Sequence, residues 1–248
     1  MAGINAARAV FDKEPITIDR SRGYVGVLID DLVTKGTNEP YRMMTSRSEY
    51  RLLLRQDNAD ERLTEIGWQA GLISDERLAQ VRQKYEAVDT EIRRLHTVAV
   101  HVSRETNELL ESAGTTPLTL GIRLDELLKR PQLTYKMLSP LDPDRPDLSA
   151  EITEQVEIRI KYEGYIRRAQ IDAEAFRRQE GRRLPSDLDY AQIPGIRTEA
   201  RQKLNTAHPL SLGQASRISG VNPADIAALM IWLDANRPSR KDEISGEG

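Results

Sequence analysis

The sequence predicts a mainly α-helical protein, and three observations support this prediction. Charged residues make up 30% of the 248 residues and aromatic residues only 5%, a balance that suits helices with solvated faces. Apolar side chains recur at steps of three and four residues in several segments. Residues that favour helix starts precede these segments, and glycine or proline follows them. We therefore expect a multi-helix domain that ends in a small helical bundle.

The amino-terminal part should hold three helices and one short strand. The helices are expected at residues 2–10, 24–36 and 58–71, the second ending at Gly36, and the strand at 16–18. Asn58, with Glu61 three residues later, has the pattern of a capping box.

A longer helix should follow, with Ser74 as its N-cap. Its apolar residues alternate steps of three and four, as in a heptad seam: Leu78, Val81, Tyr85, Val88, Ile92 and Leu95. The pattern stops before Thr97 and covers fewer than three full heptads. It therefore predicts an intramolecular helical hairpin rather than a long coiled coil.

The second half should be helical too, with one interruption. We expect short helices near 103–110 and 124–130, a proline-rich linker at 139–148, one long helix over 149–179 with Gly164 as its weak point, and three further helices at 198–204, 210–219 and 223–236. We place domain boundaries accordingly, at 1–70, 71–148 and 149–236, with a flexible tail at 237–248.

No catalytic or metal-binding constellation stands out. The sequence has no cysteine, which excludes thiolate chemistry and Cys-ligated metals. His96, His101 and His208 do not cluster, and no glycine-rich loop follows a strand to cradle a phosphate. No apolar run approaches the roughly 20 residues of a membrane span. We expect a cytoplasmic chain without catalytic, cofactor or metal sites of its own.

The net charge of -3 by itself predicts no nucleic-acid binding. Charge is unevenly distributed, which can guide a polyanion to one face, although an ordinary solvated surface also explains the distribution. In residues 40–58, arginines and tyrosines alternate with small hydroxyl residues. Guanidinium groups match phosphate oxygens and tyrosine rings stack on unpaired bases, so the segment has the chemistry of an RNA-facing surface. An arginine network that pairs with Glu49, Asp57 and Asp60 to hold a loop explains the pattern equally well.

Residues 212–226 have the spacing of a helix-turn-helix, with Gly220 at the turn. The helix that would enter a DNA groove carries Ala224, Asp225 and Trp232 but no basic or amide side chain. A docking element for a protein partner is the better interpretation. A DNA-binding regulator and a purely structural helical module remain as alternatives.

Several stretches resemble the GidA (MnmG) family of tRNA-modification enzymes, in the right order and over essentially residues 1–236. They are Gly26–Arg42, Thr45–Arg47, Glu49–Arg51, Arg55–Asp60, Arg130–Pro131 with Tyr135, Lys161–Ile166 and Leu212–Ile226. The first of them is long and unusual in composition, which makes coincidence implausible.

The resemblance implies an enzyme with an FAD domain, an inserted NAD-binding domain and a carboxyl-terminal helical domain. Such enzymes act as homodimers with an MnmE-type GTPase. They use FAD, NADH and a methylene-tetrahydrofolate donor to add an aminomethyl or carboxymethylaminomethyl group at carbon 5 of the tRNA wobble uridine. This chain would then hold a short remnant of the α/β FAD-binding domain within residues 1–70, with the cofactor sites upstream of Met1.

Two groups of site residues follow from these patterns and from the resemblance. The tRNA-binding set is Arg42, Arg47, Arg51, Arg55, Tyr41, Tyr50, Lys161, Arg167 and Arg168. The set that docks the GTPase is Gly213, Gln214, Arg217, Gly220, Ile226, Met230 and Trp232.

Overall fold

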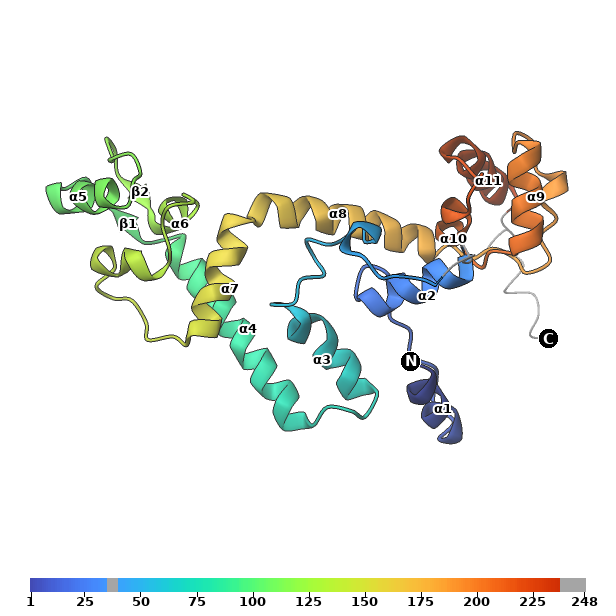
Figure 1. Cartoon of the computed structure of the whole chain (residues 1–248), viewed down its shortest axis with the longest axis horizontal. Helices are drawn as coiled ribbons and strands as arrows, with labels where there is room; N and C mark the ends of the chain where they lie inside the picture. Colours follow the sequence, from blue (N-terminus) through green and yellow to red (C-terminus); the bar gives the residue numbers. More distant parts are fainter. Residues whose placement is uncertain (35–39, 237–248) are drawn as a thin grey trace, which may run out of the picture. The chain divides into compact units, whose positions relative to one another are not determined.

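The computed structural model describes residues 1–34 and 40–236 and is mainly helical, as predicted (Figure 1). It forms two compact units. Unit 1 joins residues 1–23 to 50–169, and unit 2 joins the described parts of 24–49 and 170–248. Each unit has a hydrophobic core of its own, and each is described by itself.

Unit 1 contains most of the helices and a small antiparallel sheet. Its elements are α1 (Ala2–Val10), α3 (Ala59–Gln69), α4 (Asp75–Leu95), β1 (Ala99–Val100), α5 (Arg104–Ser112), β2 (Ile122–Arg123), α6 (Leu124–Leu128), η2 (Lys136–Leu141) and α7 (Ala150–Lys161). The two strands pair Ala99 with Arg123 and Val100 with Ile122. Two-residue strands carry too short a pattern for the sequence to predict them.

Helix α4 organises unit 1, packing against α3 on one side and against α6 and α7 on another (Figure 1). The Ser74 side chain accepts a hydrogen bond from the Arg77 N–H, which confirms the predicted N-cap. All members of the predicted heptad seam are buried except Ile92, which is partly buried. The predicted hairpin is formed by α3 and α4, with Gly71 at φ 79° in the turn.

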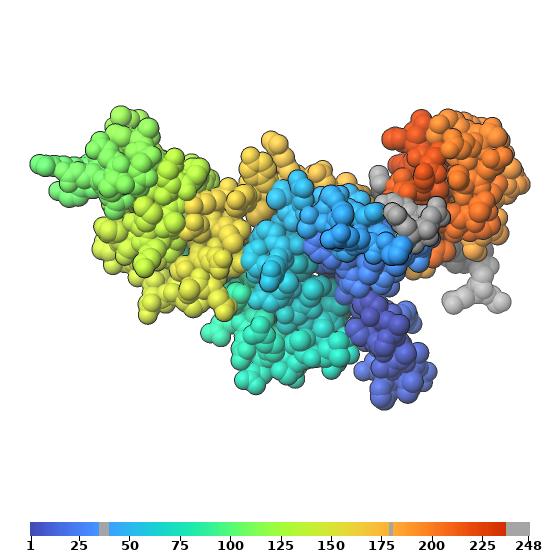
Figure 2. Space-filling view, viewed as in Figure 1, coloured from blue at the N-terminus to red at the C-terminus, as the bar shows by residue number. Residues whose placement is uncertain are grey.

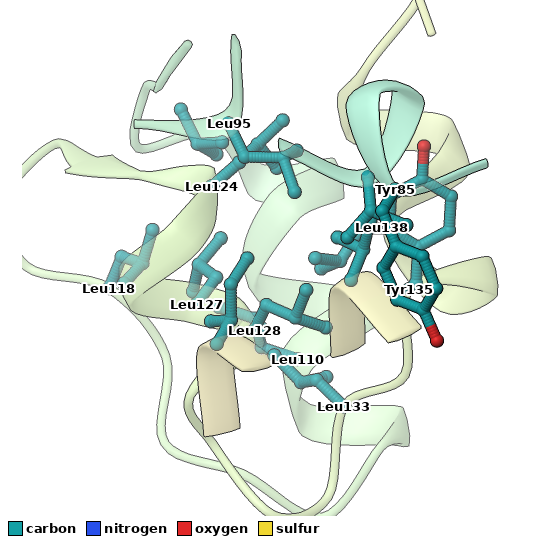
Figure 3. Close-up of a cluster of buried hydrophobic side chains, with 14 of the residues drawn as sticks. Tyr85, Leu95, Leu110, Leu118, Leu124, Leu127, Leu128, Leu133, Tyr135 and Leu138 are labelled. Atoms are coloured by element: carbon teal, nitrogen blue, oxygen red, sulfur yellow. The ribbon is translucent and has the colours of Figure 1, made fainter. Parts of the chain in front are cut away.

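The core of unit 1 is built mainly from leucines (Figure 3). Helix α6 contributes Leu124, Leu127 and Leu128, which have no exposed surface. Leu110 of α5 and the ring of Tyr135 close the same cluster, in which Figure 3 shows the labelled leucines gathered between the helices. A five-residue helix is marginal alone, so this burial stabilises α6.

The predicted long helix over 149–179 is interrupted. Helix α7 ends at Lys161 and α8 (Glu163–Glu180) begins two residues later, with Tyr162 at φ -104° and ψ 10° between them. Gly164, the predicted weak point, lies inside α8. The predicted boundary at 148 also differs from the observed one at 169, because Val156 and Ile160 of α7 belong to the core of unit 1.

Two local predictions are wrong, and in both places an asparagine side chain forms hydrogen bonds that the sequence did not predict. Residues 16–18 form no strand, since the Asn5 amide bonds both the N–H and the carbonyl of Ile16, at 2.8 and 3.0 Å. Asn58 is the N-cap residue of α3, but its side chain forms no capping hydrogen bond and therefore no capping box. It donates to the Leu53 carbonyl and accepts from Arg62 instead.

Unit 2 ends in the predicted small helical bundle. Its elements are α2 (Tyr24–Thr34), η1 (Thr45–Arg47), the carboxyl-terminal part of α8, η3 (Tyr190–Gln192), α9 (Thr198–Ala207), α10 (Leu212–Arg217) and α11 (Pro223–Ala235). Figure 2 shows α9 to α11, in orange and red, as one closely packed mass. Gly36 and the predicted flexible tail at 237–248 lie outside the described residues.

Capping explains where the last helices begin. Asn222 and Asp225 form a complete capping box at the start of α11, with Pro223 at its first position. Ser211 caps α10 by accepting from the Gln214 N–H. Helix α9 starts at Thr198, but Arg197 is its N-cap residue, with no side-chain cap. Over the residues that are described, no helix combines the length and the apolar character that crossing a membrane needs.

Leu110→Ala should lower the free energy of unfolding by about 2–5 kcal/mol, because it leaves a cavity in the fully buried leucine cluster. Leu120→Ala is the matched control, since Leu120 is 79% exposed and its truncation should cost less than about 0.5 kcal/mol. Urea denaturation followed by far-UV circular dichroism measures both. Equal losses in the two variants would contradict this core.

Candidate RNA interface and docking surface

The arginine- and tyrosine-rich segment 40–58 is divided between the two units. Tyr41, Arg42 and Arg47 belong to unit 2, whereas Tyr50, Arg51 and Arg55 belong to unit 1. The structure therefore brings together members of each half but does not define one continuous face over the whole segment.

In unit 2, Tyr41 is held in place from both ends. Its hydroxyl donates a hydrogen bond to Oδ2 of Asp31, a buried carboxylate of α2, at 2.7 Å. The guanidinium of Arg47 lies 4.9 Å from the centre of the Tyr41 ring, a cation–π distance. Arg47 and Arg42 are both exposed. Among the described residues, the Arg42 side chain forms no hydrogen bond or ion pair.

In unit 1, Arg55 is used internally. Its Nε lies 3.0 Å from Oδ1 of Asp57, its Nη2 lies 3.0 Å from Oδ2, and its Nη1 donates to the Leu52 carbonyl. Burial alone would raise the pKa of Asp57, but the hydrogen bonds from Arg55 and Gln155 outweigh it and lower that pKa. This geometry supports the loop-holding role that the sequence left open for Arg55.

Tyr50 and Arg51 are adjacent but differ in exposure. The Tyr50 ring is buried, so it cannot stack on a base in this conformation. Arg51 is exposed, and its side chain has no hydrogen-bond or ion-pair partner in the described part of the chain. Of the predicted contacts in this half of the segment, Arg51 alone is left available.

The predicted basic residues around the α7–α8 junction also differ. The Lys161 ammonium donates to the Leu133 carbonyl at 2.6 Å and to Glu157 at 2.8 Å, so it stabilises the packing of α7. Arg167 and Arg168 are exposed. Neither is paired with an acid within residues 1–34 and 40–236.

Most of the predicted docking residues face inward. Gly213 and Ile226 are buried, and Met230 and Trp232 pack partly buried against the core of unit 2. The Gln214 side chain accepts from the Leu210 N–H. Gly220 has φ 95°, a backbone conformation that side-chain-bearing residues rarely adopt, so this turn favours glycine.

Arg217 fastens α10 to two other elements of unit 2. Its Nη2 donates to Oδ1 of Asp30 in α2 at 2.8 Å, and its guanidinium lies 5.0 Å from the centre of the Phe176 ring in α8. With only 11% of its side chain exposed, Arg217 is a structural link in this unit.

The exposed apolar residue of α11 is one that sequence reasoning missed. Ile231 is 71% exposed, between the partly buried Met230 and Trp232. Helix α11 is apolar on nearly all sides, so the pattern gave no contrast from which to predict the exposed face. Where the structure is described, no three His, Cys, Asp or Glu side chains gather in a geometry for a metal.

A buried carboxylate anchors the turn between α10 and α11. Asp225 accepts from the Asn222 N–H at 2.9 Å, the Arg197 N–H at 3.0 Å and the Arg197 guanidinium at 2.8 Å. The hydrogen bonds from Arg197 are the main cause that lowers the pKa of Asp225 to about 2, against the opposing effect of burial.

Comparisons with known proteins agree with this architecture. A family model described as the tRNA modifying enzyme MnmG/GidA C-terminal helical domain matches residues 75–170. A second, described as the MnmG/GidA C-terminal helical bundle, matches residues 172–247. The chain belongs to the MnmG/GidA family. The two matched regions meet close to the observed division of α8 between the units.

Similar MnmG sequences and GidA structures cover nearly the whole chain. It is 55% identical over 237 residues to the tRNA uridine 5-carboxymethylaminomethyl modification enzyme MnmG of Lachnoclostridium phytofermentans, covering 96% of this chain and 38% of that protein. Bacillus subtilis MnmG is 52% identical, again with 96% and 38% covered. Aquifex aeolicus GidA in its form II crystal is 39% identical with a TM-score of 0.77, over 94% of this chain and 36% of that one. The chain thus spans well under half of the length of these relatives.

Stability of unit 2 should fall as the pH drops from about 4 to 2. The folded-state pKa of Asp225, about 2, lies below the ordinary value of 3.8. Its contribution is therefore complete above pH 3.8 and is lost as the pH falls through the folded-state value.

Asp225→Asn should lower the free energy of unfolding at pH 7 and flatten this acid dependence, as measured by tryptophan fluorescence in urea at several pH values. Asp172→Asn is the control, because Asp172 is exposed. An unchanged acid dependence in Asp225→Asn would contradict the assignment.

Proposed function

We propose that this chain is the tRNA- and partner-contacting helical part of an MnmG-type flavoenzyme. Such an enzyme installs an aminomethyl or carboxymethylaminomethyl group at carbon 5 of the tRNA wobble uridine. Family membership supports the enzyme class. The main support for the proposed role of this chain is a set of exposed arginines that form no ion pair with acidic residues of the described chain.

The arginines fall into two groups. Arg55, Arg159 and Arg197 form hydrogen-bonded ion pairs with acids of the chain. Arg42, Arg51, Arg167 and Arg168 are exposed and, among the described residues, make no such pair. A guanidinium that is free to form two parallel hydrogen bonds suits a phosphate oxygen pair. This second group supplies the proposed tRNA contacts.

The flavin chemistry is assigned to no residue of this chain. The described strands contain two residues each, and β2 leads directly into α6 without a glycine-rich turn. Such a framework does not fit the cradle that a dinucleotide pyrophosphate needs. In the proposed enzyme, FAD and NADH are bound by the larger part that the MnmG relatives have outside the matched region.

The bundle of α9 to α11 is the proposed docking site for an MnmE-type GTPase in the homodimeric enzyme. Its exposed apolar residue Ile231 on α11 and Leu210 before α10 offer contacts that the buried members of the predicted set do not. The alternative of DNA reading is disfavoured because α11 carries no basic side chain. A purely structural module would bind protein and no RNA.

The double variant Arg42→Ala with Arg51→Ala should bind tRNA about tenfold or more weakly. Log Kd should also depend less steeply on log salt, because up to about two phosphate contacts are lost. Filter binding with unmodified tRNA over a salt titration measures both quantities. Arg104→Ala is the matched control, because Arg104 is exposed but pairs with Glu108. A double variant with the wild-type salt dependence would remove these arginines from the RNA interface.

Ile231→Asp should weaken binding of an MnmE-type GTPase by about tenfold or more, since it places a charge in an apolar contact. Circular dichroism should show an unchanged fold, because Ile231 is 71% exposed. Leu120→Asp in unit 1 is the control, and calorimetry with the purified GTPase gives both affinities. Wild-type affinity in Ile231→Asp would place the docking site elsewhere.

A further inference from the structure

The junction between α7 and α8 carries two tyrosine rings that the fold does not use. Tyr162 is 50% exposed and Tyr165 is 62% exposed, whereas Tyr50, Tyr85 and Tyr135 of the same unit are buried. In the described structure, neither exposed tyrosine makes a side-chain hydrogen bond or a cation–π contact. Two large rings that are half or more exposed to water and make no such interaction in the described chain are typical of a surface that stacks on something else.

The backbone places both rings on one side of the junction. Tyr162 lies between the two helices, and the hydrogen bond from the Ile166 N–H to the Tyr162 carbonyl, at 2.9 Å, continues the helical pattern across the break. Residues three apart in such a pattern are neighbours on the helix surface. Tyr165 therefore lies next to Tyr162, and Arg168 lies next to Tyr165.

The acids closest to the junction are already paired. Glu163 lies 3.3 Å from the Lys129 ammonium, and Glu157 lies 2.8 Å from that of Lys161. The charges of Arg167 and Arg168 are not offset by these acids. The junction thus combines aromatic rings with available positive charge, which is the composition of surfaces that bind single-stranded nucleic acid.

Gly164 is a second sign of an outside contact. It lies in the first turn of α8, its φ is not positive, and a Cβ built on it would meet no atom within 4 Å. Nothing in the described chain therefore requires a glycine, although glycine is a poor helix former. Gly164 precedes Arg167 and Arg168 by three and four residues, so it leaves a gap in the helix surface beside both guanidinium groups.

A groove of about 450 Å³ begins at Tyr162. Thr134 and Lys136 also line it, together with Thr153 and Glu154 of α7. Hydroxyl and carboxylate oxygens can accept hydrogen bonds from base amino groups, and lysine can contact a phosphate. The groove is large enough for a nucleotide and has polar groups that match one.

We propose that Tyr162 and Tyr165 form a stacking platform for unpaired nucleotides of the bound RNA, with Arg167 and Arg168 on the adjoining phosphates. Gly164 allows the sugar-phosphate backbone to approach the helix closely, and the groove at Tyr162 accepts an extruded base. This inference rests on the proposed RNA-binding function. It adds the specific claim that unpaired bases are held by two rings rather than by charge alone.

The test compares ring loss with ring retention. Tyr162→Leu with Tyr165→Leu removes both rings while keeping apolar side chains, and Tyr162→Phe with Tyr165→Phe keeps the rings. Affinities are measured with the 248-residue chain for an unmodified tRNA transcript, a single-stranded uridine oligonucleotide and a fully paired RNA duplex. Since loss of stacking weakens binding by about tenfold per base, the leucine pair should bind the first two probes at least about tenfold more weakly.

The remaining measurements distinguish the contribution of ring stacking to RNA affinity from that of charge. The leucine pair should keep the wild-type dependence of log Kd on log salt and the wild-type affinity for the duplex. The phenylalanine pair should bind all three probes as the wild type does. Gly164→Leu should raise the Tm, because the position is open and leucine favours helix, and should still weaken tRNA binding.

The outcomes distinguish this inference from the proposed function. Wild-type chain that binds none of the RNA probes overturns both. Wild-type chain that binds tRNA, with equal affinity in the leucine pair or in Gly164→Leu, overturns the stacking platform alone. A leucine pair that loses affinity for an MnmE-type GTPase but not for tRNA shows a protein contact and overturns it as well.

Discussion

The packing of α4 against α7 is the contact on which unit 1 depends. Val88 of α4 and Val156 of α7 have no exposed surface, and Ile160 is almost as buried. Beside this apolar contact, Arg159 of α7 pairs with Glu61 of α3 and Asp89 of α4. Isolated helices as short as α3 and α7, with 11 and 12 residues, are marginal in water. Packing on α4 therefore stabilises both. The α7–α8 junction takes its position from the same contact.

Buried carboxylates form ion pairs with several arginines, and these arginines are not available for the proposed RNA contacts. Glu91 is buried and accepts from Arg94 and from the Tyr135 hydroxyl, and Arg94 also pairs with buried Asp142. Burial and the Glu91 hydrogen bond raise the pKa of Tyr135 to about 12. A buried carboxylate that loses its partner is costly, so such arginines are fixed by folding. Arg42, Arg51, Arg167 and Arg168 pair with no carboxylate of the described residues, which makes them informative about function.

The sequence predicted local signals well and distant partners poorly. Ser74 starts α4 as expected, because a cap depends on residues within one turn. Gln155, in contrast, bonds Asp57 from 98 positions away. This hydrogen bond and the one from Arg55 both fix the Asp57 carboxylate. A contact between residues so far apart in the sequence has no periodic pattern from which it could be predicted. The same limit hid the internal roles of Lys161 and Arg217, since composition shows a charge but not its partner.

The two proposed surfaces work by different physics. Arginine contacts with a polyanion act over a Debye length of about 8–10 Å and weaken as salt rises. Contact through Ile231 is apolar, acts at short range and depends little on salt. Binding of RNA to the basic surface therefore does not use the interaction that holds a protein on the bundle. The two proposed roles are therefore compatible, because a polyanion on the exposed arginines would not weaken an apolar contact at Ile231.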